Sequence, residues 1–351
     1  MILNEGRIKL AHNISFSWFC PSHGPGANGH NTIYNLNDIL KVVKQAEQIG
    51  IESILTPADS NCYDPWILAA FIVQNTTRIK PIVALRTGFI EPVYATRMLS
   101  TFYELSSGRI EINIVSGGSK IELLKEGNLL AHEDRYKRTN EFVQIMHSLL
   151  KSTNQSYIFS GKFYEVKNAT LYPSIEQEPK IYIAGSSRSS KEIASNFNDT
   201  YLLWAEPRSN VKEHIDELHK IKGDIPVCLR INILIRDSDE LAQKTAQSYG
   251  SKLTSQMARL ITKHSDSVGQ KRMSELAKDI KCYDECLWTG LSIGKTGSVP
   301  TLIGSKKTVK EAIQKYINIG VNGFIFSSFT PEEDLLHLKE IIRDLKIINK
   351  N

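Results

Sequence analysis

The stretch PKIYIAGSSRSSKEIASNF (residues 179–197) has the pattern of one strand–turn–helix unit. Its first part, residues 180–185, is apolar on both faces, as buried parallel strands are. Small and hydroxylated residues follow, and a helical pattern begins after them. The stretch therefore predicts an α/β fold in which strands and helices alternate.

The turn within this unit, AGSSRSSKE (184–192), allows two interpretations. In the first, Ser186, Ser187 or Ser189 caps the first turn of the helix. In the second, the free N–H groups and the positive dipole end of the helix N-terminus bind a dianion. The turn alone does not decide between them.

The same alternation continues along the chain. Apolar runs rich in β-forming residues are separated by amphipathic segments, such as 36–50 and 308–320, which end in glycine. Eight such units predict a closed (β/α)₈ TIM barrel. A doubly wound open sheet is the alternative, but no G-x-G-x-x-G follows the first run. The predicted strands are 14–20, 52–56, 80–85, 110–115, 180–185, 201–205, 227–235 and 323–328.

The connection between the seventh and eighth predicted strands is unusually long. We interpret the chain as one domain, residues 1–351, with an insertion at about 240–305. Residues 287–304 are rich in Gly, Ser and Thr, which predicts a mobile lid, since long loops in compact domains are usually functional or disordered.

Composition excludes several classes of protein. With 41% hydrophobic and 23% charged residues, the chain is typical of a globular protein, and its net charge of +5 is spread too evenly for a nucleic-acid footprint. The five cysteines lack zinc-site spacing, so we expect no metal. Free thiols, the absence of a run of ~20 apolar residues and the absence of a signal peptide together predict a cytoplasmic protein.

Polar and aromatic side chains follow the predicted strands, and the C-terminal strand ends of a TIM barrel carry its active site. Arg230 and Asn232 are two residues apart on one strand and share a face. An interior arginine is almost never buried without a partner. The candidates in strand order are His23, Asp59, Cys62, Arg86, Asn113, Trp204, Arg230, Asn232 and Phe329.

The segment HEDRYKRTNEF (132–142) gives a second anion signal. His132 and Tyr136 are four residues apart and face the same way on a helix. A solvated basic helix is the plain alternative. If this helix packs near residues 184–192, the two side chains form a phosphate clamp with Ser186 and Ser187. No Walker motif is present, which argues against a nucleoside triphosphate.

Taken in order, these segments resemble the bacterial luciferase-like flavin-dependent monooxygenases, and among them the alkanesulfonate monooxygenases. The resemblance extends from about Ile14 to about Ile342. The family implies a (β/α)₈ barrel with an insertion before the last strand. The matching segments include FCPSHGPG, CYDPWILAA, VALRTG, LSSGRIEINIVSGGS, HEDRYKRTNEF, IYIAGSS, LLWAEP, DSVGQKRM, CLWTG and VNGFIFSSF.

The resemblance implies a cofactor, reduced FMN, which a separate NAD(P)H:flavin reductase supplies, with O₂ as co-substrate. A flavin peroxide then oxidises a small anionic organosulfur substrate, with C–S cleavage to an aldehyde and sulfite. The family also implies homodimers or homotetramers. The positions implied for FMN are His132, Tyr136, Ser186 and Ser187 at the phosphate and Asn113 near the ring, with Asp59 and Arg86 as further cofactor contacts.

The resemblance also assigns residues to the reaction, and here the chain departs from the alkanesulfonate pattern. Arg230 and Cys62 match the family's active-site arginine and cysteine. Asn232 replaces a histidine and cannot carry a proton at neutral pH. Phe329 replaces a tyrosine, and Lys295 or Ile293 falls near the lid's arginine. The substrate-binding positions implied are His23, Trp204, Lys295 and Phe329.

These departures leave the predicted flavin site intact and should alter substrate specificity. The substrate could therefore be a sulfone, or a carboxylated or carrier-bound metabolite, in place of an alkanesulfonate. Three further functions stay open: an oxidoreductase that uses deazaflavin, a non-catalytic flavin-binding protein and a scaffold barrel without flavin affinity.

Overall fold

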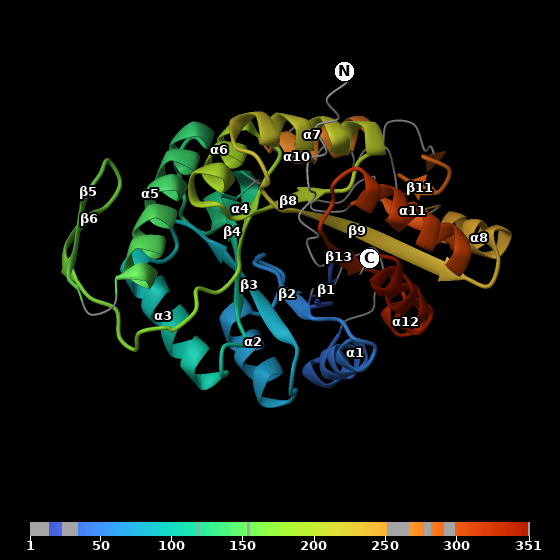
Figure 1. Ribbon diagram of the computed structural model, residues 1–351, viewed down its shortest axis with the longest axis horizontal. Helices are drawn as coiled ribbons and strands as arrows, with labels where there is room; N and C mark the ends of the chain where they lie inside the picture. Colours follow the sequence, from blue (N-terminus) through green and yellow to red (C-terminus); the bar gives the residue numbers. More distant parts are fainter. Residues whose placement is uncertain are drawn as a thin grey trace, which may run out of the picture.

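A computed structural model describes residues 14–22, 34–117, 120–152, 155–250, 267–276, 282–290 and 299–349 (Figure 1). Within these ranges, eight parallel strands form a barrel that closes where β8 pairs with β9. All eight predicted strands are confirmed, and the open sheet is excluded. The strands are β1 (Ser15–Phe19), β2 (Ser53–Thr56), β3 (Lys80–Arg86), β4 (Glu111–Val115), β7 (Ile181–Ala184), β8 (Thr200–Trp204), β9 (Val227–Arg236) and β13 (Gly323–Ser327).

Helices surround the barrel (Figure 1). Their starts follow ordinary capping chemistry: the Asn35 side chain accepts from the N–H groups of Asn37 and Asp38 at the start of α1. The predicted helices at 36–50 and 308–320 are α1 and α11. The surrounding helices are α1 (Leu36–Gln48), α2 (Pro65–Gln74), α3 (Pro92–Leu105), α4 (Lys120–Lys125), α5 (His132–Lys151), α6 (Arg188–Phe197), α7 (Arg208–Ile221), α11 (Lys306–Asn318) and α12 (Pro331–Ile348).

The strands alternate between two apolar clusters, as the period of two requires. Val83 and Leu85 of β3 belong to the large cluster that includes residues of the surrounding helices, whereas Ile82 and Ala84 belong to a smaller cluster. Tyr182 belongs to this second cluster, and its hydroxyl donates to Glu111 Oε2 at 2.9 Å. Side chains therefore fill this part of the barrel, which is a packed core rather than a pore.

Extra elements lie between β9 and β13, where the sequence predicts an insertion. Strand β9 is long: Cys228–Asn232 pairs with β13, and Asn232–Arg236 pairs with β12 (Figure 1). The prediction of a loop at 287–304 is wrong at both ends of this range, because buried apolar residues there form the strands β11 and β12. The mobile lid stays a prediction, and so does the interpretation of residues 1–351 as a single domain. These elements are α8 (Asp239–Gly250), α10 (Val268–Leu276), β10 (Cys282–Tyr283), β11 (Leu287–Trp288) and β12 (Thr301–Ser305).

A hairpin that the sequence analysis did not predict packs beside α5. It consists of β5 (Tyr157–Ser160) and β6 (Glu165–Ala169), and five of these nine strand residues are exposed. Glu141 of α5 accepts hydrogen bonds from main-chain N–H groups of the hairpin turn, at 2.8–3.2 Å. Among the described helices, none is long and apolar enough to cross a membrane.

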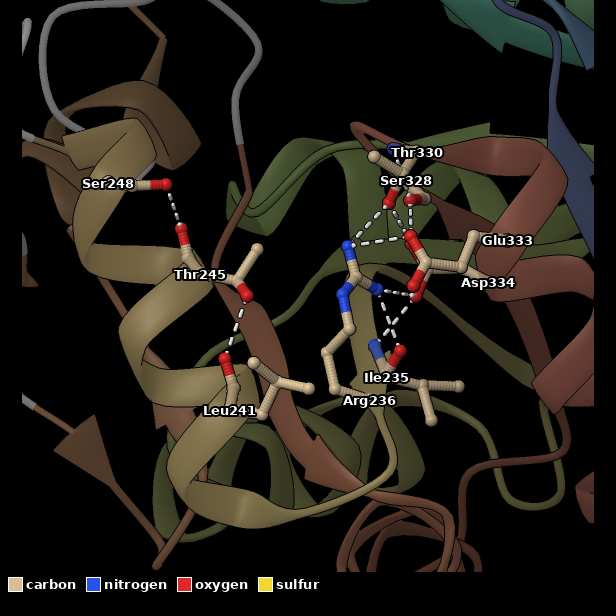
Figure 2. A network of polar contacts seen from close by, with 9 residues as sticks. All are labelled: Ile235, Arg236, Leu241, Thr245, Ser248, Ser328, Thr330, Glu333 and Asp334. Atoms are coloured by element: carbon tan, nitrogen blue, oxygen red, sulfur yellow. Dashed lines mark hydrogen bonds and ion pairs between the residues drawn. The ribbon is translucent and has the colours of Figure 1, made fainter.

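A buried polar network joins the far end of β9 to the start of α12 (Figure 2). Asp334 is fully buried and accepts from the main-chain N–H of Ile235 at 2.6 Å, from Thr330 Oγ1 at 2.8 Å and from Ser328 Oγ. Arg236 Nη1 lies 3.2 Å from Asp334 Oδ1. The network fixes the extended half of β9, on which the insertion is built.

We predict that Asp334→Ala lowers the free energy of unfolding by about 3–5 kcal/mol, because it leaves Arg236 buried without its inner partner. Glu333→Ala is the matched control, since Glu333 contacts the same guanidinium at 3.1 Å but its side chain is 49% exposed. Glu333→Ala should lower the free energy of unfolding by less than about 1 kcal/mol. Urea denaturation measures both, and equal losses would contradict the structural role of the buried carboxylate.

Candidate active site

A cavity of about 250 Å³ opens at the C-terminal ends of the barrel strands. Strand register explains its polar lining. Arg230 is in register with Trp204 of β8 and Ile325 of β13, and Ile325 points into the barrel. Neighbours in register share a face, so all three side chains point inward. The predicted site residues that line the cavity are Asp59, Arg86, Asn113, His132, Tyr136, Ser186, Trp204 and Arg230.

Other predicted site residues lie elsewhere. Asn232 is buried at the junction of β9 and β12, where its Nδ2 donates to the Val299 carbonyl at 3.0 Å and its Oδ1 accepts from Ser327 Oγ. Phe329 packs in a small apolar cluster of the insertion, with its ring 5.9 Å from that of Tyr249. Neither lines the cavity. His23 and Lys295 lie outside the described residues.

The two serines after β7 have different roles. Ser187 Oγ accepts from the Ser190 N–H at 3.2 Å and caps α6, whereas Ser186 lines the cavity. The cap interpretation is therefore confirmed for Ser187, whereas anion binding at Ser186 stays a prediction. Gly185 has φ +153°, and a Cβ there would lie 2.7 Å from Ser190 Oγ and 3.1 Å from the Tyr136 hydroxyl. Only glycine allows this close approach.

His132 and Tyr136 stand on the first turns of α5, with ring centroids 5.0 Å apart. Both line the cavity beside Ser186, as the clamp hypothesis requires. The neighbouring arginines are used structurally: Arg135 donates to the Leu130 carbonyl at 2.8 Å, and Arg138 donates to the Thr87 carbonyl at 3.0 Å. The polar groups of the clamp are thus a phenol, an imidazole and a hydroxyl.

The start of α10 contributes residues that the sequence reasoning did not name. Gly269 approaches Ser186 so closely that a Cβ would lie 3.1 Å from its Oγ, and Gln270 also lines the cavity. The segment DSVGQKRM contains the one sequence feature that could have indicated this contact, which is a small residue at the start of a helix. Two helix N-termini, those of α6 and α10, therefore meet at Ser186, and each favours an anion.

An ion pair holds α10 in this place. Arg272 Nε and Nη2 donate to the Glu206 carboxylate at 2.9 and 2.7 Å. Burial alone would raise the pKa of Glu206, but hydrogen bonds from His214, Arg272 and Asn210, with the charge of Arg272, lower it to about 2. Glu206 is thus ionised at neutral pH and keeps α10 against the loop after β8.

Asn113 presents an unsatisfied acceptor to the cavity. It is 4% exposed, and its Oδ1 accepts no hydrogen bond from the described part of the chain. A buried acceptor without a donor is costly, so this oxygen fits a ligand that supplies an N–H or O–H. A flavin ring carries such an N–H group.

The wall near β2 and β3 is acidic. Arg86 lines the cavity, but protein groups already hold it: Nη1 lies 2.5 Å from Glu126, and Nη2 lies 2.8 Å from the Ala58 carbonyl and 3.2 Å from Glu122. Asp59 shares a hydrogen bond with Glu122. Arg86 therefore carries little free charge toward a cofactor.

Arg230 supplies the positive charge of the opposite wall. Its guanidinium carbon lies 4.1 Å from the centroid of the Phe19 ring, a cation–π contact. Burial lowers the pKa of Arg230 to about 10, so it remains charged at neutral pH. Burial and the charge of Asp59 raise the pKa of the nearby Cys62 to about 12. Cys62 is thus a neutral thiol at neutral pH.

The fold and this site define a class: TIM-barrel proteins with a polar cavity at the C-terminal ends of the barrel strands. The chain matches the family model of the luciferase-like monooxygenases over residues 14–323. It belongs to that family.

Several solved structures share the fold of this chain. EDTA monooxygenase from Chelativorans sp. BNC1 superposes with a TM-score of 0.74 at 18% identity, covering 96% of this chain and 93% of that one. Riboflavin lyase with modified FMN and riboflavin gives 0.76 at 17%, covering 95% and 92%. An F420-dependent secondary alcohol dehydrogenase gives 0.68 at 16%, covering 94% and 98%. At these identities the likeness concerns the fold.

We predict that Arg272→Met frees α10, because Glu206 loses the cation that holds the helix. Hydrogen–deuterium exchange of peptides within residues 268–276 should become faster in the ligand-free protein. Arg188→Met is the control: Arg188 forms an ion pair with Glu192 at 2.8 Å, but its side chain is 88% exposed on α6. Unchanged exchange in α10 after Arg272→Met would contradict the role of the pair.

Proposed function

We propose that the protein is a two-component monooxygenase that uses reduced FMN and O₂ on a small anionic organosulfur substrate. A separate NAD(P)H:flavin reductase in the cytoplasm supplies the reduced flavin. One observation supports the proposal most directly. The same cavity is lined by Ser186, where the N-termini of α6 and α10 meet, and by Asn113, whose Oδ1 accepts no hydrogen bond from the described residues. Family membership supports the oxygenase chemistry.

The residues present fit FMN. Ser186 Oγ, the Tyr136 hydroxyl, His132 and the N–H groups at the starts of α6 and α10 would hold the phosphate. Asn113 Oδ1 would accept from the ring. When bound, reduced flavin supplies the electrons that activate O₂, and the protein excludes water and positions the substrate.

Arg230 is the group best placed to hold an anionic substrate. It is a charged guanidinium beside the Phe19 ring, and such a group binds sulfonate or carboxylate oxygens in a fork geometry. Trp204 and Phe19 supply apolar surface in the same cavity. We therefore propose an alkanesulfonate-type substrate cleaved to an aldehyde and sulfite, with a sulfone or a carboxylated metabolite as the alternative.

A second candidate is an oxidoreductase that uses a deazaflavin. The fold shared with the F420-dependent secondary alcohol dehydrogenase favours testing it. The two functions differ in their use of oxygen, because a monooxygenase consumes O₂ and a dehydrogenase does not.

We predict that Ser186→Ala and Tyr136→Ala each weaken binding of reduced FMN at least about tenfold, since each removes a phosphate contact worth on the order of 1.5 kcal/mol. Ser187→Ala is the matched control: it should cost about 1 kcal/mol of stability through the lost cap and leave affinity nearly unchanged. Anaerobic fluorescence titration measures affinity. Unchanged affinity in the first two variants would place the phosphate elsewhere.

We predict that Arg230→Ala abolishes substrate-dependent turnover and spares binding of reduced FMN. Arg230→Lys should keep binding and recover part of the activity, because it restores charge without the fork geometry. A panel of sulfonates, sulfones and carboxylates, with product analysis, measures turnover. Equal loss of FMN binding and turnover in Arg230→Ala would show that the guanidinium serves the cofactor.

A further inference from the structure

A buried histidine lies between two carboxylates near the C-terminal end of α5. The Nδ1 of His147 lies 3.2 Å from Glu178 Oε2, and its Nε2 lies 3.1 Å from each carboxylate oxygen of Asp199. Glu178 precedes β7, and Asp199 stands between α6 and β8. The imidazole therefore joins α5 to the segments that lead into two neighbouring strands of the barrel.

The two contacts require both ring nitrogens to donate. A neutral imidazole carries one N–H, and its other nitrogen accepts, whereas an ionised carboxylate only accepts. Because each nitrogen of His147 faces a different carboxylate, only the imidazolium form makes both hydrogen bonds to ionised carboxylates. The equal distances from Nε2 to the two oxygens of Asp199 fit one N–H that an ionised carboxylate shares between its oxygens. The geometry thus indicates a positive charge on His147.

The surroundings of the ring favour this charge. The ring of Phe197, the last residue of α6, is stacked on the imidazole, with centroids 5.2 Å apart and planes at 8° to each other. The face of an aromatic ring attracts a cation. Asp199 is 6% exposed, and a buried carboxylate is rarely left without a partner, whereas the Glu178 side chain is 37% exposed. One proton on His147 therefore supports a buried ion pair, an outer ion pair and a ring contact.

We propose that protonated His147 is a pH-sensitive lock between α5 and the segments before β7 and β8. When the proton passes to solvent as the pH rises, one ring nitrogen becomes an acceptor and faces a carboxylate that also only accepts. Two acceptors repel each other, so the end of α5 separates from its neighbours more often. His147, Glu178 and Asp199 do not line the cavity, so the lock does not depend on which cofactor binds there. It acts on the same helix that carries His132 and Tyr136 on its first turns.

The lock weakens in one direction of pH. Burial alone would lower the pKa of His147, but the hydrogen bonds and charges of Asp199 and Glu178 raise it above the ordinary value of 6.5. The stabilisation is thus fully present below pH 6.5 and is lost as the pH rises from there through the raised pKa. Burial also raises the pKa of Asp199, against the hydrogen bond and charge of His147, so the Asp199 anion depends on the imidazolium. The charged groups that face the lock, from the elements packed against it, are Glu178, Asp199 and Lys151.

Nuclear magnetic resonance of the ligand-free protein tests the charge directly. Long-range ¹H–¹⁵N spectra distinguish an imidazolium, which has two N–H groups, from a neutral ring, and His147→Gln identifies the signal. We expect His147 to be mostly imidazolium at pH 6.5 and to titrate with a pKa above that value. His219, which is exposed on α7, gives the signal of a histidine in solvent in the same spectra. A pKa of 6.5 or below for His147 in the folded protein would overturn the proposal.

Hydrogen–deuterium exchange tests the lock itself. After correction for the intrinsic dependence of exchange on pH, opening of residues 140–151 in wild type should become more frequent between pH 6.5 and the raised pKa. The limit for the release of one proton is about tenfold per pH unit. His147→Gln removes the titrating ring and should flatten this dependence, whereas the control His219→Gln should keep it. The same dependence in wild type and in His147→Gln would overturn the lock, whether or not the protein binds flavin.

Discussion

The hydrogen bonds of β9 are the constraint on which the rest of the structure depends. Along its first half, β9 pairs with β8 on one side and β13 on the other, and this closes the barrel. Closure brings the C-terminal ends of all the parallel strands to one mouth. Along its second half β9 pairs with β12, so the same strand also supports the insertion. The buried carboxylate of Asp334 fixes that outer half (Figure 2).

Closure explains why residues far apart in sequence meet in one cavity. Asn113 and Arg230 point inward, since their register neighbours Ala84 and Ile325 belong to the interior of the barrel. The insertion then completes the site, because Glu206 holds α10 against Ser186. The cavity has a cationic wall at Arg230 and an acidic wall at Asp59 and Glu122. We propose that the cationic wall binds the anionic substrate.

Much of this arrangement could be predicted from the sequence, because strand and helix periods are local properties. All eight barrel strands follow from such patterns. The placement of Ser186, His132 and Tyr136 around one cavity does not, because it was expected only if α5 packs near the turn after β7, as the family resemblance implied. Family membership is confirmed, whereas the alkanesulfonate substrate and the separate reductase stay proposals. The α10 contact at Gly269 depends on how an insertion folds back, which no local pattern specifies.

The direction of side chains beyond the rim of the barrel could not be predicted from the sequence either. Arg230 and Asn232 share a face of β9, yet only Arg230 lines the cavity, because β9 leaves the barrel at Asn232 and pairs with β12 there. Phe329 is likewise taken by a cluster of the insertion. The alkanesulfonate positions that differ here, Asn232 and Phe329, therefore do not line the cavity, whereas Arg230 and Trp204 do.

The most direct test of the central claim is anaerobic titration of the wild-type protein with reduced FMN and, separately, with a reduced deazaflavin. Each complex is then mixed with oxygenated buffer while flavin absorbance and O₂ uptake are recorded. We predict tight binding of reduced FMN, weak binding of the deazaflavin and O₂ uptake that depends on the protein-bound flavin. Failure to bind reduced FMN, or binding of the deazaflavin alone without O₂ uptake, would contradict the proposed monooxygenase.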